Sequence, residues 1–415
     1  MHNERKRGTK MSRYDFDTVI ERRGTICAKW DGMEPIFGSG DLLPMWVADM
    51  DFKAPPEVIE VLRERVDHGI FGYTRRFAPY REAIAGWFER RHGWKPDTEW
   101  IRHTPGVVPA LAAAILAFTQ PGDGVLVQPP VYYPFFATIT GRGRRVVENP
   151  LIFTGSRFEM DFADLEKKLD DSSVKLVFLC SPHNPCGRVW TREELERFAR
   201  ICASRGVIVV SDEIHCDILF GGARHVPLAD VSEAIRDLSV TTVAPSKTFN
   251  IAGLSTAAVI IPSKRLRDNY QSVIDFLHID GGNVFGTLAL EAAYTKGDAW
   301  LDELLAYLAG NLDFIESFLA ERLPHIRLIR PEGTYIPLLD CRSLNMSGPE
   351  LQNLLVEKGR VALDGGHWFG TGGTGFVRIN IAAPRILLKE GMEGIERAVR
   401  SPGPFPARDI RSFQA

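Results

Sequence analysis

The sequence predicts an α/β fold in which a large region with a mostly parallel central sheet flanked by helices precedes a smaller α+β region. Two observations predict this class. Helix and strand patterns alternate from about residue 55 to residue 295. The strand patterns are short apolar runs rich in β-branched residues, which are typical of strands buried on both faces of a parallel sheet.

The helices of the large region are predicted from apolar residues that recur with helical period, at residues 56–68, 80–91, 107–119, 191–204 and 284–295. The strands between and after them are expected at residues 124–128, 145–148, 174–180, 207–210, 240–243 and 256–261. A long amphipathic stretch over residues 300–323 then leads into the smaller region. That region contains further segments at residues 327–330, 335–339, 351–358 and 376–381.

Four parts of the chain follow from this pattern. Residues 1–55 show little periodicity, and we expect them to pack on the small domain or on a partner subunit. Residues 56–295 are predicted to form the large domain, and residues 296–400 the small C-terminal domain. Residues 401–415, rich in Pro and Arg, are expected to be a loose tail, and the polar residues 1–10 an extension outside the fold.

Composition excludes several classes of protein. Of the 415 residues, 45% are hydrophobic and 25% charged, as in globular proteins. A net charge of −3 gives no reason to expect nucleic acid or an anionic membrane as partner. No segment approaches the ~18 apolar residues of a membrane span, and the N-terminus has no apolar signal core. The 6 cysteines form no C-x-x-C pair, so we expect reduced thiols in the cytoplasm, without a metal site or disulfide framework.

Polar residues follow three of the predicted strands. Asn184 comes after residues 174–180, Asp212 and His215 after residues 207–210, and Lys247 after residues 240–243. Ligands of open α/β sheets gather at the carboxyl ends of the strands, so these side chains are expected to meet there. A lysine amine can condense with the aldehyde of pyridoxal phosphate, and an aspartate can keep its pyridine nitrogen protonated. The ordered set therefore predicts a pyridoxal phosphate site.

Each of these residues has a simpler interpretation when taken alone. A lysine is usually a solvated surface residue, and an aspartate that ends a strand is more often a turn former or helix cap. A histidine among apolar residues is more often a hydrogen-bonded core residue. The combination in this order carries the specificity.

The chain also resembles fold type I pyridoxal-phosphate enzymes of the aminotransferase class I/II superfamily. More narrowly, it is similar to the branch of cystathionine β-lyases and cysteine-S-conjugate C–S lyases (MalY/PatB type). The resemblance runs from about Tyr14 to Arg400. Besides the three strand-end segments, it rests on residues 22–25 (RRGT), 29–31 (KWD), 45–52 (MWVADMDF), 71–74 (FGYT) and 131–134 (VYYP).

The resemblance implies roles for the residues at the matching positions. Lys247 would form the Schiff base and move protons at the substrate α-carbon, and Asp212 would pair with the pyridine nitrogen. Asn184 and His215 would lie near the phenolic oxygen. Tyr132 would stack on the ring, although a core tyrosine at a strand end is the alternative.

Further residues are implied at the two ends of the cofactor and at the substrate. The backbone of Gly106, Val107 and Val108 at a helix start, and the hydroxyl of Ser246, would bind the phosphate. Tyr73 would reach the phosphate of the neighbouring subunit in a homodimer with shared active sites. Arg378 would clamp the substrate carboxylate, with internal hydrogen bonds as the alternative for a buried arginine. Ala48 and Tyr133 would contact the substrate.

The sequence departs from many aminotransferases near the lysine. Ala244 and Ser255 stand where those enzymes carry a serine and an arginine for the phosphate, and His215 stands where many have tyrosine. The lyase branch shares this variation, so we expect a C–S β-lyase that releases a thiol, pyruvate and ammonia. An aminotransferase is the alternative, because it uses the same residues. A regulatory protein that binds pyridoxal phosphate is a more remote one.

Overall fold

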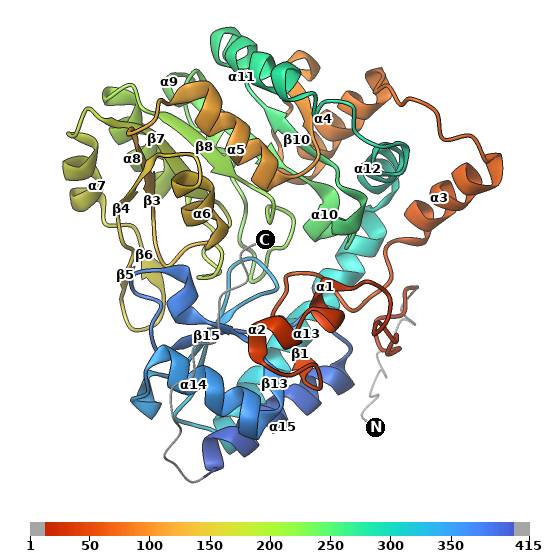
Figure 1. The fold of residues 1–415 in the computed structure, drawn as a ribbon, viewed down its shortest axis with the longest axis vertical. Coiled ribbons are helices and arrows are strands. Elements are labelled where there is room, and N and C mark those ends of the chain that lie inside the picture. Colours follow the sequence, from red (N-terminus) through yellow and green to blue (C-terminus); the bar gives the residue numbers. More distant parts are fainter. Residues whose placement is uncertain (1–12, 402–415) are drawn as a thin grey trace, which may run out of the picture.

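The computed structural model describes residues 13–401 and is built around a mixed, mostly parallel sheet (Figure 1). Neighbouring strands from β9 to β4 run parallel, whereas β10 is antiparallel to both β9 and β2. The spatial order is β2 (Ile101–Thr104), β10 (Ala257–Ile260), β9 (Ser239–Val243), β8 (Ile208–Asp212), β7 (Val174–Cys180), β3 (Gly124–Val127) and β4 (Arg145–Glu148). The mostly parallel sheet of the sequence prediction is confirmed.

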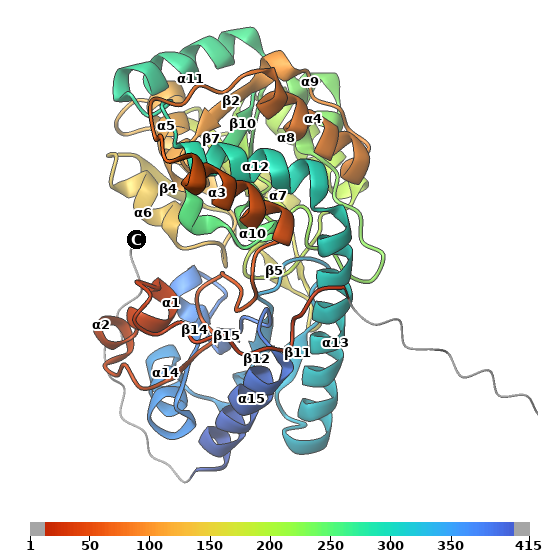
Figure 2. The same cartoon turned by 90° about the vertical axis from the view of Figure 1, so that its right-hand side faces the viewer.

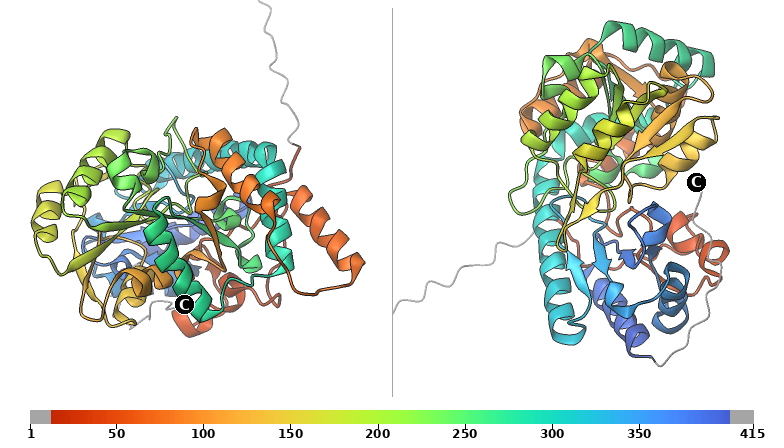
Figure 3. Two further views of the ribbon diagram at one scale, coloured as in Figure 1. Left: turned by 90° about the horizontal axis from the view of Figure 1, so that it is seen from above. Right: turned by 90° about the vertical axis from the view of Figure 1, so that its left-hand side faces the viewer.

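Helices cover both faces of this sheet, as the views in Figure 3 show. Val125 and Val127 of β3 pack in one apolar cluster with α5 (Val107–Phe118) and α11 (Lys264–Leu277). Leu126, between them, packs in another cluster with α8 (Arg192–Ser204) and α7 (Phe162–Leu169). Alternate residues of a strand point to opposite faces, so a continuous apolar run is needed here. The remaining helices around the sheet are α3 (Pro56–His68), α4 (Ala78–His92), α6 (Pro134–Thr140), α9 (Glu233–Arg236), α10 (Pro245–Thr248) and α12 (Val284–Lys296).

The second region begins with α13 (Asp298–Arg322), a long helix that runs alongside both halves of the molecule in Figure 2. It leads into an antiparallel sheet with the order β11, β12, β15, β14. The elements of this region are β11 (Arg327–Ile329), β12 (Leu338–Asp340), α14 (Gly348–Leu354), β13 (Val361–Ala362), β14 (Asp364–Gly365), β15 (Phe376–Arg378) and α15 (Arg385–Arg400). A π-helical turn, Leu355–Gly359, extends α14.

The N-terminal residues pack against the second region. Strand β1 (Leu43–Pro44) pairs in parallel with β13. Helices α1 (Ala28–Asp31) and α2 (Glu34–Phe37) precede it, and Met33, Phe37 and Trp46 share an apolar cluster with Val356 and Ala362. A small hairpin of β5 (Ile152–Phe153) and β6 (Phe158–Glu159) lies beside the same region in Figure 1.

The sequence analysis did not predict α11 or α15. In α11 the apolar residues Leu266, Tyr270 and Ile274 recur every four residues among polar ones, and this spacing is the signal that could have shown the helix. The expectations for residues 1–10 and for the tail lie outside the described residues, apart from Ser401. Within residues 13–401, no helix is long and apolar enough to cross a membrane.

The register of the sheet brings the predicted polar residues together. Cys180, the last residue of β7, is paired with Asp212, the last residue of β8, and Asp212 is paired with Thr242 near the end of β9. The segments that follow these three strands therefore start at the same edge of the sheet.

Candidate active site

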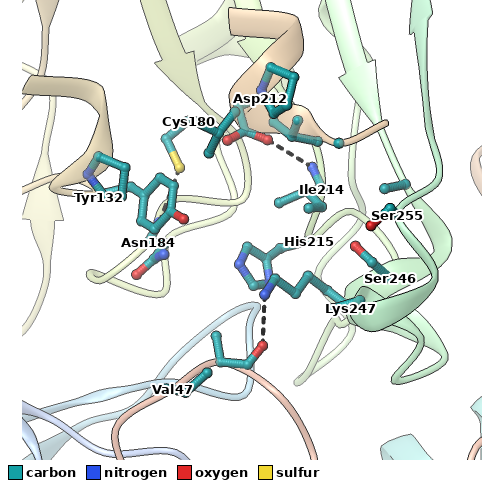
Figure 4. A pocket seen from close by; sticks show the side chains of 18 of the residues that line it. Val47, Tyr132, Cys180, Asn184, Asp212, Ile214, His215, Ser246, Lys247 and Ser255 are labelled. Atoms are coloured by element: carbon teal, nitrogen blue, oxygen red, sulfur yellow. Dashed lines mark hydrogen bonds between the residues drawn. The ribbon is translucent and has the colours of Figure 1, made fainter. Parts of the chain in front are cut away.

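A cavity of about 300 Å³ lies at the carboxyl ends of β7, β8 and β9 (Figure 4). Its size falls within the roughly 300–1,000 Å³ of ligand pockets. With one exception, every site residue predicted from the sequence lines it: Ala48, Gly106, Val107, Val108, Tyr132, Tyr133, Asn184, Asp212, His215, Ser246, Lys247 and Arg378. The exception is Tyr73, which is fully exposed in the loop between α3 and α4.

Lys247 lies on α10, a single turn that begins directly after β9. Its Nζ donates a hydrogen bond of 2.7 Å to the carbonyl oxygen of Ala48, which the N-terminal segment brings to the cavity. Burial lowers the pKa of Lys247 to about 8, with Asp49 opposing the shift and Arg378 adding to it. A large fraction of this amine is therefore neutral near pH 8, the form that attacks an aldehyde.

Asp212 ends β8 and accepts a hydrogen bond of 3.2 Å from the amide of Ile214. Burial raises its pKa to about 7, against the opposing effects of that amide and of Lys247. An acid with this pKa is costly to ionise inside the cavity and gains from a cation placed opposite it.

Arg378, on β15, is bonded internally and also lines the cavity. It donates to Asn184 Oδ1 (2.8 Å) and to the carbonyl oxygen of Trp46 (3.1 Å), and it forms an ion pair with Asp364. Its Nε is buried and has no hydrogen-bond partner among residues 13–401. The two interpretations of this arginine from the sequence therefore coexist, because internal bonds hold the guanidinium while one donor remains available.

His215 and Tyr132 supply further polar atoms to the cavity. Burial lowers the pKa of His215 well below its ordinary value, and Lys247 and Arg378 add to the effect, so the ring is neutral. Its Nδ1 has no partner within the described part of the chain. Burial raises the pKa of Tyr132 to about 12, so its hydroxyl keeps its proton.

The other end of the cavity is formed by the start of α5. Gly106 precedes this helix, and the first helical residues, Val107 and Val108, line the cavity with it. Unpaired amides at a helix N-terminus favour an anion. Ser246, Ser255 and Thr256 also line the cavity, and Figure 4 shows Ser246 and Ser255 close to Lys247.

Known proteins can now be compared with this geometry. The family model described as aminotransferase class I and II matches residues 41–395. The chain belongs to the aminotransferase class I and II family.

Among the relatives of this family member, cystathionine beta-lyase PatB of Bacillus subtilis is 46% identical over 93% of this chain and 100% of its own length. Protein MalY of Escherichia coli is 37% identical over 94% of this chain and 99% of its own. The structure of the PLP-bound C-S lyase from Staphylococcus hominis superimposes with a TM-score of 0.88 at 34% identity, covering 94% of this chain and 99% of that one. The predicted fold type and the predicted lyase branch are confirmed.

Sequence reasoning missed four residues of the site in this family member. Cys180 lines the cavity, the hydroxyl of Tyr335 donates to the carbonyl oxygen of Ala48 (3.0 Å), and Asp364 pairs with Arg378. Asp49 acts on the pKa of Lys247 through its charge. Tyr335 fell within a predicted strand, but no pattern along the chain indicated its partner, because these contacts join distant segments.

Proposed function

We propose that this protein is a pyridoxal-phosphate-dependent C–S β-lyase that cleaves cystathionine or related cysteine S-conjugates by α,β-elimination. The products are a thiol, pyruvate and ammonia. The observation that carries the proposal is the buried pair of Lys247 and Asp212 in one cavity, in a chain similar over its length to a cystathionine β-lyase.

The residues of the cavity fit pyridoxal phosphate. Asp212 is a buried acid that a protonated pyridine nitrogen would stabilise, and Lys247 is a buried amine held close to neutral. His215 Nδ1 is a buried polar atom that lacks a partner within residues 13–401, as expected of a group that bonds a ligand. The start of α5 and Ser246 would hold the phosphate, and Tyr132 would stack on the ring.

When bound, the cofactor draws electrons from the substrate α-carbon. Lys247 tethers the cofactor and, once displaced by the substrate amine, takes the proton from the α-carbon. Asp212 keeps the pyridine nitrogen protonated. Arg378 orients the substrate by binding its carboxylate, which adds a partner to a guanidinium already held by Asn184 and Asp364.

The lining of the cavity supports a substrate with one carboxylate near an uncharged thioether. Arg378 is the one arginine among the described residues that line it. Beside it, Val47, Tyr133 and Ile214 offer largely apolar contacts, and burial raises the pKa of Tyr133 far above its ordinary value, so this ring carries no charge. A thioether sulfur is tolerated in such surroundings, whereas a second carboxylate would need a partner.

An assay without added keto acid tests the proposal against the aminotransferase alternative. Purified holoenzyme is incubated with cystathionine or an S-alkyl cysteine, and pyruvate, ammonia and free thiol are measured. The lyase produces all three in equal amounts, and Lys247→Ala should abolish their formation. Strict dependence on a keto acid, with no thiol released, would instead establish transamination.

Three further expectations belong to this proposal. We propose a homodimer in which Tyr73 of each chain completes the site of the other. We propose residues 56–295 and 296–400 as two domains with the cavity between them. We also propose a cytoplasmic location, since the 6 cysteines form no disulfide, as expected in a reducing compartment.

A further inference from the structure

Two acidic residues beside the cavity make their contacts away from it. Asp212 and His215 line the cavity, whereas Glu213 and Asp217 of the same segment are buried and do not. Glu213 accepts hydrogen bonds from Ser211 Oγ (2.8 Å) and from the amide of Leu228 (3.0 Å). Asp217 reaches other helices, and its partners connect two parts of the site.

Asp217 accepts three hydrogen bonds. Its Oδ1 accepts from Trp87 Nε1 (3.0 Å) and His92 Nε2 (2.8 Å), both on α4, and its Oδ2 accepts from Thr248 Oγ1 (2.7 Å). Burial raises the pKa of Asp217, but the bonds from His92, Thr248 and Trp87 outweigh it, so the pKa is lowered and the group stays ionised. His92, Cys216 and Asp217 lie close enough to hold a metal ion, yet Asp217 already uses both oxygens on protein donors.

Thr248 directly follows Lys247 on α10 and is buried. A helix of four residues cannot hold its own conformation, so contacts with other elements must hold it. The bond from Thr248 to Asp217 joins the turn that carries Lys247 to the segment that carries Asp212 and His215. The next residue, Phe249, packs edge-on against Trp87, with 5.4 Å between ring centroids, so the donor to Asp217 also supports this turn.

We propose that Asp217 and Thr248 are positioning residues that determine where Lys247 Nζ lies relative to Asp212 and His215. The inference rests on the proposed role of Lys247. The amine must reach both the cofactor aldehyde and the substrate α-carbon, and a displacement of about 1 Å at a reacting group can cost about 100-fold in rate. A hydroxyl outside the cavity therefore controls the reactivity of the amine inside it.

Thr248→Val tests the proposal, because valine keeps the shape of the side chain and removes the hydroxyl. Apoenzyme is mixed with pyridoxal phosphate, and the rate at which the borohydride-trappable link to Lys247 forms is measured, together with kcat and KM. We expect link formation and kcat to fall at least about tenfold, with KM changed by less than about threefold. Thr248→Ser, which restores the hydroxyl, should recover most of both rates.

Thr241→Val is the matched control. Thr241 lies on β9, the strand that leads to α10, and is equally buried, but its hydroxyl has no hydrogen-bond partner among residues 13–401. This variant should form the link at the wild-type rate. Melting temperatures are recorded for every variant, and rates are measured well below them.

If Thr248→Val lowers only the melting temperature and leaves link formation and kcat unchanged, the bond is merely structural and the proposal is wrong. Should that variant fail to fold, Asp217→Asn replaces it, since the amide keeps one acceptor oxygen but no longer accepts from Thr248 as a charged group; unchanged link formation in that variant also overturns the proposal. The link is observed without lyase substrate, so a failure of the proposed lyase reaction is recognised separately.

Discussion

At the scale of single residues, burial moves the two central ionisable groups of the cavity towards each other. The pKa of Asp212 rises to about 7 and that of Lys247 falls to about 8. Desolvation disfavours the charged form of both, so a carboxyl and an amine that normally titrate far apart come close to neutrality in the same pH range. Neither group is locked in one charge state, which suits a proton that must move.

These pKa shifts predict how cofactor affinity depends on pH. As the pH falls through about 8, Lys247 becomes protonated and cannot condense, and as it falls through about 7, Asp212 becomes protonated and loses its attraction for the pyridine nitrogen. We expect the affinity of the apoenzyme for pyridoxal phosphate to fall about tenfold per pH unit for each group below its pKa. Fluorescence quenching between pH 6 and about 9 measures the dissociation constant.

Asp212→Asn separates the two contributions. This variant should bind more weakly above pH 7, and the part of the pH dependence near the pKa of Asp212 should disappear. The part near pH 8, due to Lys247, should remain. Identical profiles for wild type and variant would show that Asp212 does not face the pyridine nitrogen.

At the scale of elements, residues 47–52 are held between the two regions of the chain. Asn250, just after α10, pairs with the backbone of Met50 and donates to the carbonyl oxygen of Phe52 (2.7 Å). From the other side, Asn380, just after β15, donates to the carbonyl oxygens of Val47 and Asp49, both at 2.6 Å. The carbonyl of Ala48 is thereby held in reach of Lys247.

Buried charges hold the same segment. Asp51 accepts hydrogen bonds from Arg22 (2.6 Å), Lys29 (2.6 Å) and Trp30 (3.0 Å). Burial raises the pKa of Asp51, but the charge of Lys29 and the three bonds outweigh it, so its pKa is lowered. Three residues of the motifs 22–25 and 29–31 thus act through one carboxylate on the segment beside the cavity.

Asn380→Ala should therefore affect catalysis and not only stability. We expect a loss of about 1–3 kcal/mol of unfolding free energy from the unpaired carbonyls. We also expect kcat/KM to fall about tenfold or more, because the segment at the cavity is no longer fixed. Asn311→Ala is the matched control: Asn311 donates to the carbonyl oxygens of Ile381 and Ala383 (2.7 and 3.1 Å), outside the cavity.

Urea unfolding and steady-state kinetics measure the two effects. The control should lose comparable stability and keep kcat/KM near the wild-type value under conditions in which both proteins are folded. Equal kinetic losses in the two variants would mean that Asn380 contributes only to stability.

At the scale of the whole molecule, the loop between α3 and α4 extends away from the body of the chain, at the upper right of Figure 1. Ile70, Phe71, Tyr73 and Phe77 in this loop are exposed, and Phe71 packs against Phe285 at the start of α12 with 5.6 Å between ring centroids. A group of exposed apolar side chains marks an interaction surface. This surface supports the proposal that a second copy binds here.

Subunit exchange tests whether the active site is shared. Tyr73→Ala and Lys247→Ala, each inactive alone, are mixed under conditions that form hybrid dimers. If Tyr73 completes the partner's site, one site of the hybrid collects both defects and the other collects neither, so activity should return to about a quarter of the wild-type value per chain under random exchange.

Hybrid formation is confirmed with differently tagged chains. If both single variants are inactive, hybrids are present and no activity returns, each site belongs to one chain. Tyr73 would then act within its own chain or not at all.

The sequence by itself determined the fold class and the identity of most site residues. The strands that precede Asn184, Asp212 and Lys247 are continuous apolar runs, and parallel strands end at the same edge of a sheet, so their following residues had to meet. The three-residue and four-residue spacing of apolar side chains likewise predicted α3 to the residue. These inferences depend on local periodicity, which is written along the chain.

Only the tertiary structure decided which distant groups pair. Asp364 with Arg378, Tyr335 with the carbonyl of Ala48, and Asp217 with Thr248 join segments on different elements. Nothing in the local pattern distinguishes these side chains from other acidic, aromatic or hydroxyl residues, because their partners are set by the packing of helices and strands. Burial in that packing also sets the pKa values of Asp212 and Lys247, since the cost of a charge depends on what surrounds it.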